Sequence, residues 1–356
     1  GDEPAGRIES REEEFTGATA LGLFDYVRKS RSRGCVVSLS GGADSAATAC
    51  LVSLSLRLAE AELGLEGLRA KLPAAAGDAS SLEEVLERSL LCVYQATRHS
   101  SETTREAARA VAEGLGAEFL VLDVEELVAG YSARVERAIG RELDWDRDDL
   151  AMQNIQSRVR APSVWMLANL RGSLLLSTSN RSEAAVGYAT MDGDTAGGLS
   201  PIAGIDKAFL RRWLRWMERQ GPRVTGPVPA LAAVNALAPT AELRPQEAGQ
   251  TDEDDLMPYD ILDLIERAAI GEKKVPVEVY RTLRARFPET PPAQLGAWIE
   301  RFFRLWSRNQ WKRERYAPSF HVDDENLDPK TWCRFPILSG GFERELRQLR
   351  RLIETE

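Results

Sequence analysis

The stretch Val36-Val37-Ser38-Leu39-Ser40-Gly41-Gly42-Ala43-Asp44-Ser45-Ala46-Ala47 decides the fold. Its apolar, β-branched start predicts a strand, the Ser-Gly-Gly segment predicts a tight loop, and the alanines that follow predict a helix. Such a junction aims backbone N–H groups and a helix N-terminus at one point, which suits a phosphate group. The two glycines let the backbone approach an anion closely, and Ser40 and Ser45 add hydroxyl donors.

Asp44 is the unusual residue of this junction, because a carboxylate repels phosphate oxygens unless a cation lies between them. Mg²⁺ bound to a polyphosphate would remove that conflict. The structural alternative is an Asp that only caps a helix after a glycine turn. The loop has neither the Gly-x-x-x-x-Gly-Lys-Ser/Thr pattern nor the Gly-x-Gly-x-x-Gly pattern.

Composition excludes several classes of protein. The chain has 356 residues, enough for two average domains or one large α/β domain, and 43% of them are hydrophobic. A net charge of −9 argues against a nucleic-acid partner. No apolar run is long enough for a membrane helix and no leader segment opens the chain, so we expect a cytoplasmic protein without a membrane partner. Four scattered cysteines and two histidines make a disulfide framework or a His-based metal centre improbable.

Strand and helix patterns alternate along most of the chain. Apolar runs predict strands at 35–39, 90–95, 118–122 and 173–177, with helices between them. This alternation predicts an α/β fold, a parallel sheet with helices on both faces. A long helix is expected over 150–170, kinked or broken at Pro162. Residues 61–82 are weakly patterned and are interpreted as an insertion into which the preceding helix continues part-way. Ligands bind beyond the carboxyl ends of parallel strands, so the polar loops after the first, second and fourth strands predict one site.

A second constellation follows the fourth strand. Ser177-Thr178-Ser179-Asn180-Arg181-Ser182-Glu183 leads to Gly193-Asp194-Thr195-Ala196-Gly197-Gly198-Leu199-Ser200-Pro201. An Asn followed three residues later by Glu can be only a helix cap, and the glycine segment can be only a turn. Their occurrence together, in a chain that carries the first loop, favours a functional interpretation.

These motifs identify a resemblance. Ser-Gly-Gly-Ala-Asp-Ser resembles the pyrophosphate-binding loop of the N-type ATP pyrophosphatases, and the second constellation, followed by Lys207, resembles the NAD synthetase family. Pro239-Thr240-Ala241-Glu242-Leu243 and Asn309-Gln310-Trp311-Lys312-Arg313 match later patterns of that family. The resemblance covers about residues 12–336. It is closest to the synthetase half of the glutamine-dependent branch, since Met191, Gly198 and Trp311 depart from the short, ammonia-dependent enzymes.

The resemblance implies a Rossmann-like fold of the PP-loop (adenine nucleotide alpha hydrolase) type with a helical C-terminal region. It implies three segments: a loose arm over 1–12, the synthetase domain over 13–336 and a helical tail over 337–356. It also implies amidation of deamido-NAD to NAD through an adenylated intermediate, with release of AMP and pyrophosphate. ATP and Mg²⁺ are then expected, together with a homodimer. Ammonia would arrive free or from a glutaminase domain or subunit, because only about 30 residues precede the first strand.

Residue roles carry over from the matching motifs. The resemblance implies that ATP contacts Ser40, Gly41, Gly42, Asp44, Ser45, Thr178, Lys207 and Thr240. It implies that Asp44 and Glu183 hold the metal and that Asp44, Lys207 and Glu183 are catalytic. It implies that deamido-NAD contacts Asn154, Arg158, Tyr188, Asp194 and Lys312. For Asn154 and Arg158 the alternative is a solvated helix face.

Other interpretations remain open at this point. The chain could be another N-type pyrophosphatase, such as a GMP-synthetase-like enzyme, or a non-catalytic nucleotide-binding scaffold. The polar, acidic segment 244–259 is interpreted as a mobile cover over the ATP site, and the alternative is an exposed loop that only adds solubility.

Overall fold

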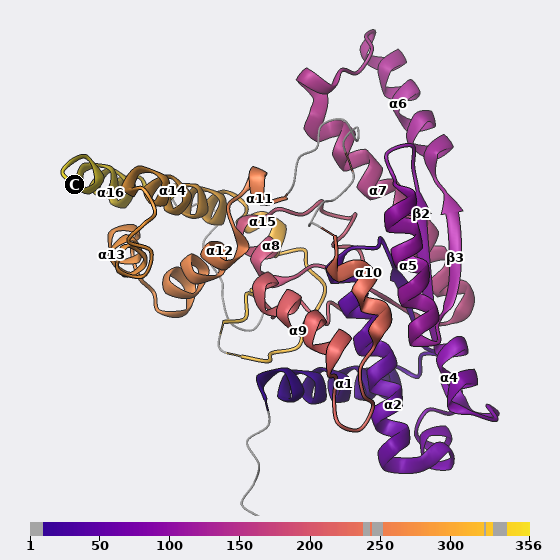
Figure 1. Cartoon of the computed structure of the whole chain (residues 1–356). Helices are drawn as coiled ribbons and strands as arrows, with labels where there is room; N and C mark the ends of the chain where they lie inside the picture. The colour runs from indigo at the N-terminus through magenta and orange to yellow at the C-terminus, as the bar shows by residue number, and fades with distance from the viewer. Residues whose placement is uncertain (1–9, 238–242, 244–251, 324, 330–339) are drawn as a thin grey trace, which may run out of the picture.

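The centre of the molecule is a four-stranded parallel sheet in the order β3-β2-β1-β4 (Figure 1). The computed structural model describes residues 10–237, 243, 252–323, 325–329 and 340–356. The strands are β1 (Cys35–Ser38), β2 (Leu90–Ala96), β3 (Glu118–Asp123) and β4 (Leu174–Leu176), each within a residue or two of its predicted range. Their direction and their alternation with helices confirm the predicted α/β class.

Helices cover both faces of this sheet. Val37 and Cys92 point into the core that the sheet shares with α2 (Ala43–Lys71), α4 (Leu82–Ser89) and α5 (Glu102–Leu115). Val36 and Val93 point to the opposite face and pack with Val164 of α7 (Trp145–Arg171). Strand residues alternate between the faces, and both faces are apolar here, so each strand reads as a continuous apolar run.

Three further helices complete the part of the molecule built around the sheet. α1 (Arg11–Ser30) packs against α2, α3 (Pro73–Ala76) follows α2, and α6 (Glu125–Ile139) packs against α7. None of the helices in the described part of the chain is long and apolar enough to span a membrane.

Pro162 does not break the helix that contains it, because α7 continues through it from Trp145 to Arg171. The buried neighbours Ala161 and Val164 hold this part of α7 on the sheet, and that packing outweighs one missing backbone hydrogen bond. The helix before residues 61–82 continues part-way into this segment, as predicted, since α2 runs to Lys71 across Gly64, whose φ of 67° marks a kink.

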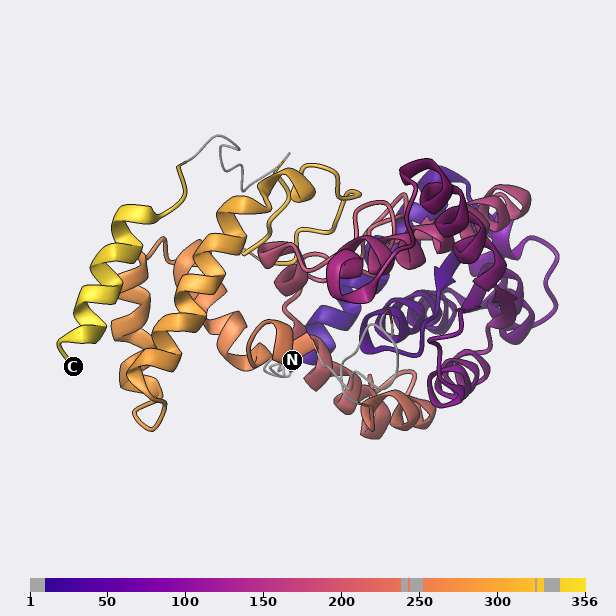
Figure 2. The same ribbon diagram turned by 90° about the horizontal axis from the view of Figure 1, so that it is seen from above.

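The C-terminal helices form a lobe beside the sheet (Figures 1 and 2). Its core is a second apolar cluster that includes Tyr280, Phe302 and Leu349. The lobe contains α12 (Tyr259–Glu266) with a π-helical turn (Arg267–Gly271), α13 (Pro276–Arg286), α14 (Pro292–Arg308) and α16 (Glu343–Glu354). This confirms the predicted helical C-terminal region, whereas the domain boundaries stay predictions.

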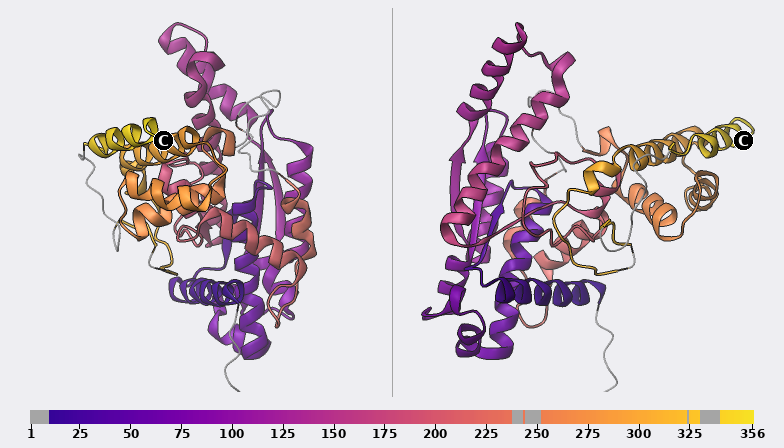
Figure 3. Two further views of the ribbon diagram at one scale, coloured as in Figure 1. Left: turned by 60° about the vertical axis from the view of Figure 1, so that its left-hand side comes forward. Right: turned by 180° about the vertical axis from the view of Figure 1, so that it is seen from behind.

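Three of the remaining elements pack into the apolar core of the sheet: α9 (Lys207–Arg219), a 3₁₀ turn (Pro229–Leu231) and α10 (Ala232–Asn235) (Figure 3). Three short helices pack toward the lobe instead: α8 (Arg181–Val186), α11 (Asp252–Asp255) and α15 (Gln310–Arg313). α8 contacts both α9 and the lobe helices α12 and α14, so it lies at the junction of the two cores.

A buried charge cluster holds this junction together. The Arg181 side chain, 2% exposed, contacts carboxylates of Glu266 at 2.5 Å, Glu325 at 2.9 Å, Asp323 at 3.0 Å and Asp206 at 3.3 Å. These partners come from α12, the segment after α15 and the N-cap of α9. One guanidinium therefore joins four separate segments, in the multidentate geometry that suits arginine.

Glu266 should give folding a measurable pH dependence. Burial, only partly opposed by Arg181, raises the pKa of Glu266 from 4.5 to about 7. The folded state then holds this proton more tightly than the unfolded chain does. The stability it contributes is fully present below pH 4.5 and is lost as the pH rises to about 7.

The test compares the wild type with Glu266→Gln, which cannot ionise and leaves Arg181 three carboxylates. Between pH 4.5 and 7 the wild type should lose unfolding free energy relative to the variant, by on the order of 3 kcal/mol. Urea unfolding at a series of pH values measures the difference. Parallel pH profiles for the two proteins would contradict the assignment.

Candidate active site

The site lies at the topological switch point of the sheet, where the strand order turns from β1 toward β2 on one side and toward β4 on the other. β1 pairs with β2 on one side and with β4 on the other, so the loops after β1 and β4 emerge next to each other. The first loop leads into α2 and the second leads into α8. Between them lies a cavity of about 570 Å³, whose lining includes residues of α5, α7 and α9 as well. The predicted convergence at this edge of the sheet is confirmed.

The loop after β1 has its backbone fixed in a strained but specific shape. Gly41 has a φ of +84°, and a side chain there would put its Cβ 2.3 Å from the backbone oxygen of Thr104 in α5. The Ser45 hydroxyl accepts from the backbone N–H of Ser40 at 3.2 Å, and the two hydroxyls lie 3.1 Å apart. Only glycine fits position 41, so the loop packs directly against the first turn of α5.

Two carboxylates and one ammonium group meet in the cavity. Lys207 Nζ lies 3.0 Å from Glu183 Oε1 and makes an ion pair with Asp44 as well. Asn180, the N-cap of α8, donates from Nδ2 to the other oxygen of Asp44 at 2.9 Å. The Lys207 side chain is 4% exposed, and it lies in the first turn of α9. Cations are disfavoured at a helix N-terminus, so the two carboxylates must offset that cost.

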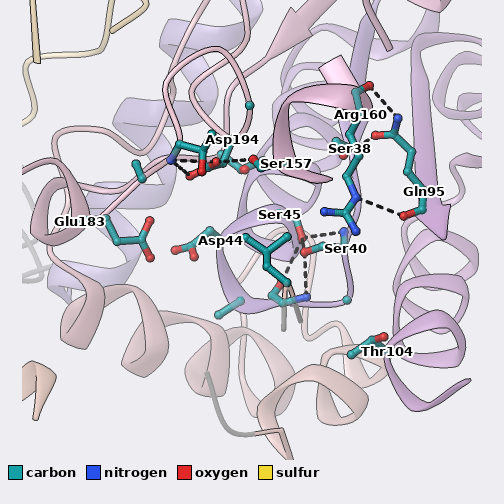
Figure 4. Close-up of a pocket in the computed structure, with 18 of the residues that line it drawn as sticks. Ser38, Ser40, Asp44, Ser45, Gln95, Thr104, Ser157, Arg160, Glu183 and Asp194 are labelled. Carbon is teal, nitrogen blue, oxygen red and sulfur yellow. Dashed lines mark hydrogen bonds between the residues drawn. The ribbon is translucent and has the colours of Figure 1, made fainter. Parts of the chain in front are cut away.

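Asp44 and Glu183 face each other in Figure 4. Because both reach one ammonium group, both lie around a single position for a cation. Among the described residues, no group of three or more His, Cys, Asp or Glu side chains could hold a metal ion. Magnesium commonly takes one or two protein carboxylates and completes its shell with phosphate oxygens and water, so this pair fits a nucleotide-bound Mg²⁺.

A second polar group stands across the cavity (Figure 4). Asp194 accepts from the Ser157 hydroxyl at 2.7 Å and from the backbone N–H of Thr190 at 3.1 Å. The Thr190 hydroxyl in turn donates to Asn154 Oδ1 at 2.8 Å. The Asp194 side chain is open to the cavity. The loss of water around its carboxyl, caused by the surrounding protein, raises the pKa of this group, and the hydrogen bonds from Ser157 and Thr190 oppose that shift. This network fixes the glycine-rich loop against α7.

Lys312 and Tyr188 line the same part of the cavity. Lys312 Nζ donates to the backbone oxygens of Gly187 at 2.7 Å and Ala189 at 2.9 Å. Burial, together with nearby arginines, lowers the pKa of Lys312 while Asp194 opposes the shift. The Tyr188 hydroxyl donates to Asp255 at 2.9 Å.

Most of the predicted site residues line this one cavity. They are Ser40, Gly41, Gly42, Asp44, Ser45, Asn154, Thr178, Glu183, Tyr188, Asp194, Lys207 and Lys312. Arg158 is exposed outside the described lining, and its Nε donates to the backbone oxygen of Met191 at 2.9 Å. Thr240 and residues 244–251, the first half of segment 244–259, fall outside the described residues. The roles of all these residues stay predictions.

Several lining residues were missed by the sequence motifs. Gln95, at the end of β2, accepts from Ser38 at 2.9 Å and donates to the Arg160 backbone oxygen at 2.7 Å (Figure 4). Arg211 and Arg215 line the cavity from α9. The available signal was their position four and eight residues after Lys207, because residues at intervals of four share one face of a helix.

Comparison with known proteins agrees with this geometry. The chain is 37% identical over 341 residues to a glutamine-dependent NAD(+) synthetase of Aquifex aeolicus, covering 95% of this chain and 51% of the relative. Against a crystal structure of a glutamine-dependent NAD(+) synthetase from Cytophaga hutchinsonii the TM-score is 0.85 at 47% identity, covering 96% of this chain and 56% of that one.

A more distant structure shares the fold. An NH3-dependent NAD synthetase from Campylobacter jejuni has a TM-score of 0.55 at 18% identity, covering 85% of this chain and 96% of that chain. Among its curated relatives, by contrast, the chain spans about half the length of the proteins it matches. The family model described as NAD synthase matches residues 17–315, which is most of the chain. With the motifs in order and the site residues assembled, this protein belongs to the NAD synthase family.

Proposed function

We propose that this chain makes NAD by ATP-dependent amidation of deamido-NAD, with AMP and pyrophosphate as the other products. The observation that carries the proposal is the meeting of Asp44, Glu183 and Lys207 beside a loop shaped for phosphate. Membership of the NAD synthase family supplies the substrate class. Relatives named glutamine-dependent NAD(+) synthetase support the same reaction.

The first step activates the nicotinate carboxylate, whose oxygen cannot leave as oxide. A carboxylate oxygen attacks the α-phosphorus of ATP, the bond to the bridging oxygen breaks, and pyrophosphate leaves with that electron pair. The backbone N–H groups of the loop at Gly41 and Gly42 and the hydroxyls of Ser40 and Ser45 would bind phosphate oxygens. Lys207 would reach the α-phosphate and stabilise the negative charge that develops there.

Asp44 and Glu183 would hold the magnesium ion. Bound there, Mg²⁺ would supply charge neutralisation to the phosphate oxygens. Lys207 forms ion pairs with both carboxylates, so its ammonium group lies at the proposed metal position beside the phosphate-binding loop.

The second step transfers the acyl group to ammonia. The nitrogen lone pair attacks the carbonyl carbon of the mixed anhydride, AMP leaves, and a proton passes to solvent. The part of the cavity formed by Asn154, Tyr188, Asp194 and Lys312 would hold the dinucleotide, with Tyr188 against the pyridine ring. Ammonia would come free or from a glutaminase domain or subunit, and we propose a cytoplasmic setting.

We further propose that the chain forms a homodimer through α6. Four apolar side chains at intervals of four residues make one stripe on this helix, and all are about half exposed: Leu127 50%, Tyr131 54%, Val135 48% and Ile139 49%. A helix stripe of this kind normally packs against a partner.

The reaction can be tested with ammonium salts. The chain should convert deamido-NAD to NAD with ATP and ammonium, with pyrophosphate and AMP each formed once per NAD. The rate should rise as the pH approaches the pKa of ammonium, because NH₃ is the nucleophile. With glutamine alone the pure chain should be inactive. Pyrophosphate release that does not require deamido-NAD would point to a different substrate.

The metal assignment can be tested with Asp44→Asn and Glu183→Gln. Each should lower the rate of adenylation by roughly 100-fold or more while deamido-NAD binding changes little, since the lost charge acts on the phosphates. Rapid-quench measurement of AMP formation and direct titration of deamido-NAD give the two quantities. Asp192→Asn is the matched control, because this exposed carboxylate pairs with Arg315 outside the lining. Near-normal rates at saturating Mg²⁺ would exclude the substituted residue as a ligand.

The dimer can be tested with Val135→Glu. A charge in the middle of the α6 stripe should raise the dimer dissociation constant at least tenfold, because burying it without a partner is costly. Light scattering after size-exclusion chromatography at micromolar concentration measures the mass. Arg137→Gln changes the charge equally on another face of α6 and should leave the mass unchanged. A wild-type chain that is monomeric at these concentrations would contradict the proposal.

A further inference from the structure

The inner face of α9 carries a row of three cations. Lys207, Arg211 and Arg215 are spaced by four residues, and all three line the cavity. At a rise of roughly 1.5 Å per residue, successive members start about 6 Å apart along the helix axis. Arg219 continues the same spacing, but its side chain is 75% exposed and it is not among the described lining residues. The row therefore lines the cavity at three positions, and its next member lies outside the described lining.

The wall that shares this end of the cavity with the row suits an anion. It is formed by the loop at Gly41 and Gly42 and by the first turn of α5, with Thr103 and Thr104 in the lining. The close approach of Gly41 to the backbone of Thr104 holds the loop and the start of α5 together. Both segments contribute backbone N–H groups at helix starts, and hydroxyls besides.

A third wall fixes the position of α9. α10 packs against α9 and α5, and Asn235 Nδ2 donates to Glu218 at 2.8 Å. Val234 and Asn235 line the cavity next to the two arginines. This end of the cavity is therefore framed by α5, α9 and α10.

The described carboxylates that line the cavity already lie near lysines, which leaves Arg211 and Arg215 available for a ligand. Among the described residues, the acidic side chains of the lining are Asp44, Glu183 and Asp194. Lys207 already contacts the first two, and Lys312 lies near the third. Arg211 is 31% exposed and 4.0 Å from Glu253, a loose pair, and Arg215 is exposed to solvent. Arg160 of α7 also lines the cavity, and its Nε donates to the backbone oxygen of Gln95 at 3.2 Å. A polyphosphate carries more negative charge than Lys207 and one Mg²⁺ can balance, so it can engage several of these cations.

We propose that Arg211 and Arg215 form the subsite for the β- and γ-phosphates of ATP and hold the pyrophosphate that departs from the α-phosphorus. This inference rests on the proposed function and extends it to two residues outside the family motifs. Guanidinium groups bind phosphate oxygens in pairs, and they would stabilise the leaving group as it gains the electron pair of the broken bond. Their place at the rim also gives pyrophosphate a path out, away from the dinucleotide end.

Magnesium pyrophosphate is the direct probe, because its binding needs no turnover. Isothermal titration calorimetry should show its dissociation constant rising about tenfold for Arg211→Met and for Arg215→Met, as expected for loss of a charge-assisted pair. In the reaction, pyrophosphate should inhibit these variants correspondingly less and the KM for ATP should rise. Binding of deamido-NAD should stay unchanged. Arg211→Lys should recover part of the loss, since it keeps the charge without the paired geometry.

Arg219→Met is the matched control. It removes the same charge from the next turn of the same helix and should leave pyrophosphate binding within twofold of wild type. If Arg219→Met lost as much pyrophosphate affinity as the other two variants, the effect would come from the total positive charge of α9, and the proposal would be overturned. Wild-type pyrophosphate binding in both arginine variants would overturn it as well. If the chain makes no NAD but the titrations behave as expected, the proposed reaction fails while the phosphate subsite stands.

Discussion

The contact of one lysine with two carboxylates organises this molecule. Lys207 Nζ joins Asp44 across 163 residues of sequence and Glu183 across 24. Each charge is largely removed from solvent, so each would be costly to bury without the others. α2, α8 and α9 must therefore start around the same point, and the loops before them must end there. The cavity is a consequence of that requirement.

Around this contact the cavity divides into two ends of different character. Toward α5 and α9 the lining offers backbone donors, hydroxyls and arginines, which suit phosphate groups. Toward α7 and α15 it offers Asn154, Tyr188, Asp194 and Lys312, a mixed set that suits a larger polar ligand with a ring. The charged contact lies between the ends, where the proposed transfer from ATP to the carboxylate would take place.

The C-terminal lobe is tied to the same region by charge rather than by apolar packing alone. Arg181 begins α8 two residues before Glu183, and its carboxylate partners come from α9, α12 and the segment at 323–325. Ser182 donates to Asp263 at 2.5 Å and accepts from the backbone N–H of Lys207 at 2.9 Å. The three consecutive residues Arg181, Ser182 and Glu183 thus contact the lobe, the start of α9 and the Lys207 ammonium group.

The sequence by itself determined the parallel α/β sheet, the edge at which the site lies and the motif residues that meet in its lining. These follow from local patterns, because strand runs, glycine loops and helix caps at 38–45 and 177–183 are encoded within a few residues. The continuity of α7 through Pro162, the pairing of Lys207 with two carboxylates and the row of Arg211 and Arg215 were decided only by the tertiary structure. Packing of α7 on the sheet outweighs the helix-breaking tendency of Pro162. The ion-pair partners of Lys207 depend on which distant segments meet in the folded chain. Helical spacing shows that Arg211 shares a face with Lys207, but only the packing of α10 against both α9 and α5 turns that face into a wall of the cavity.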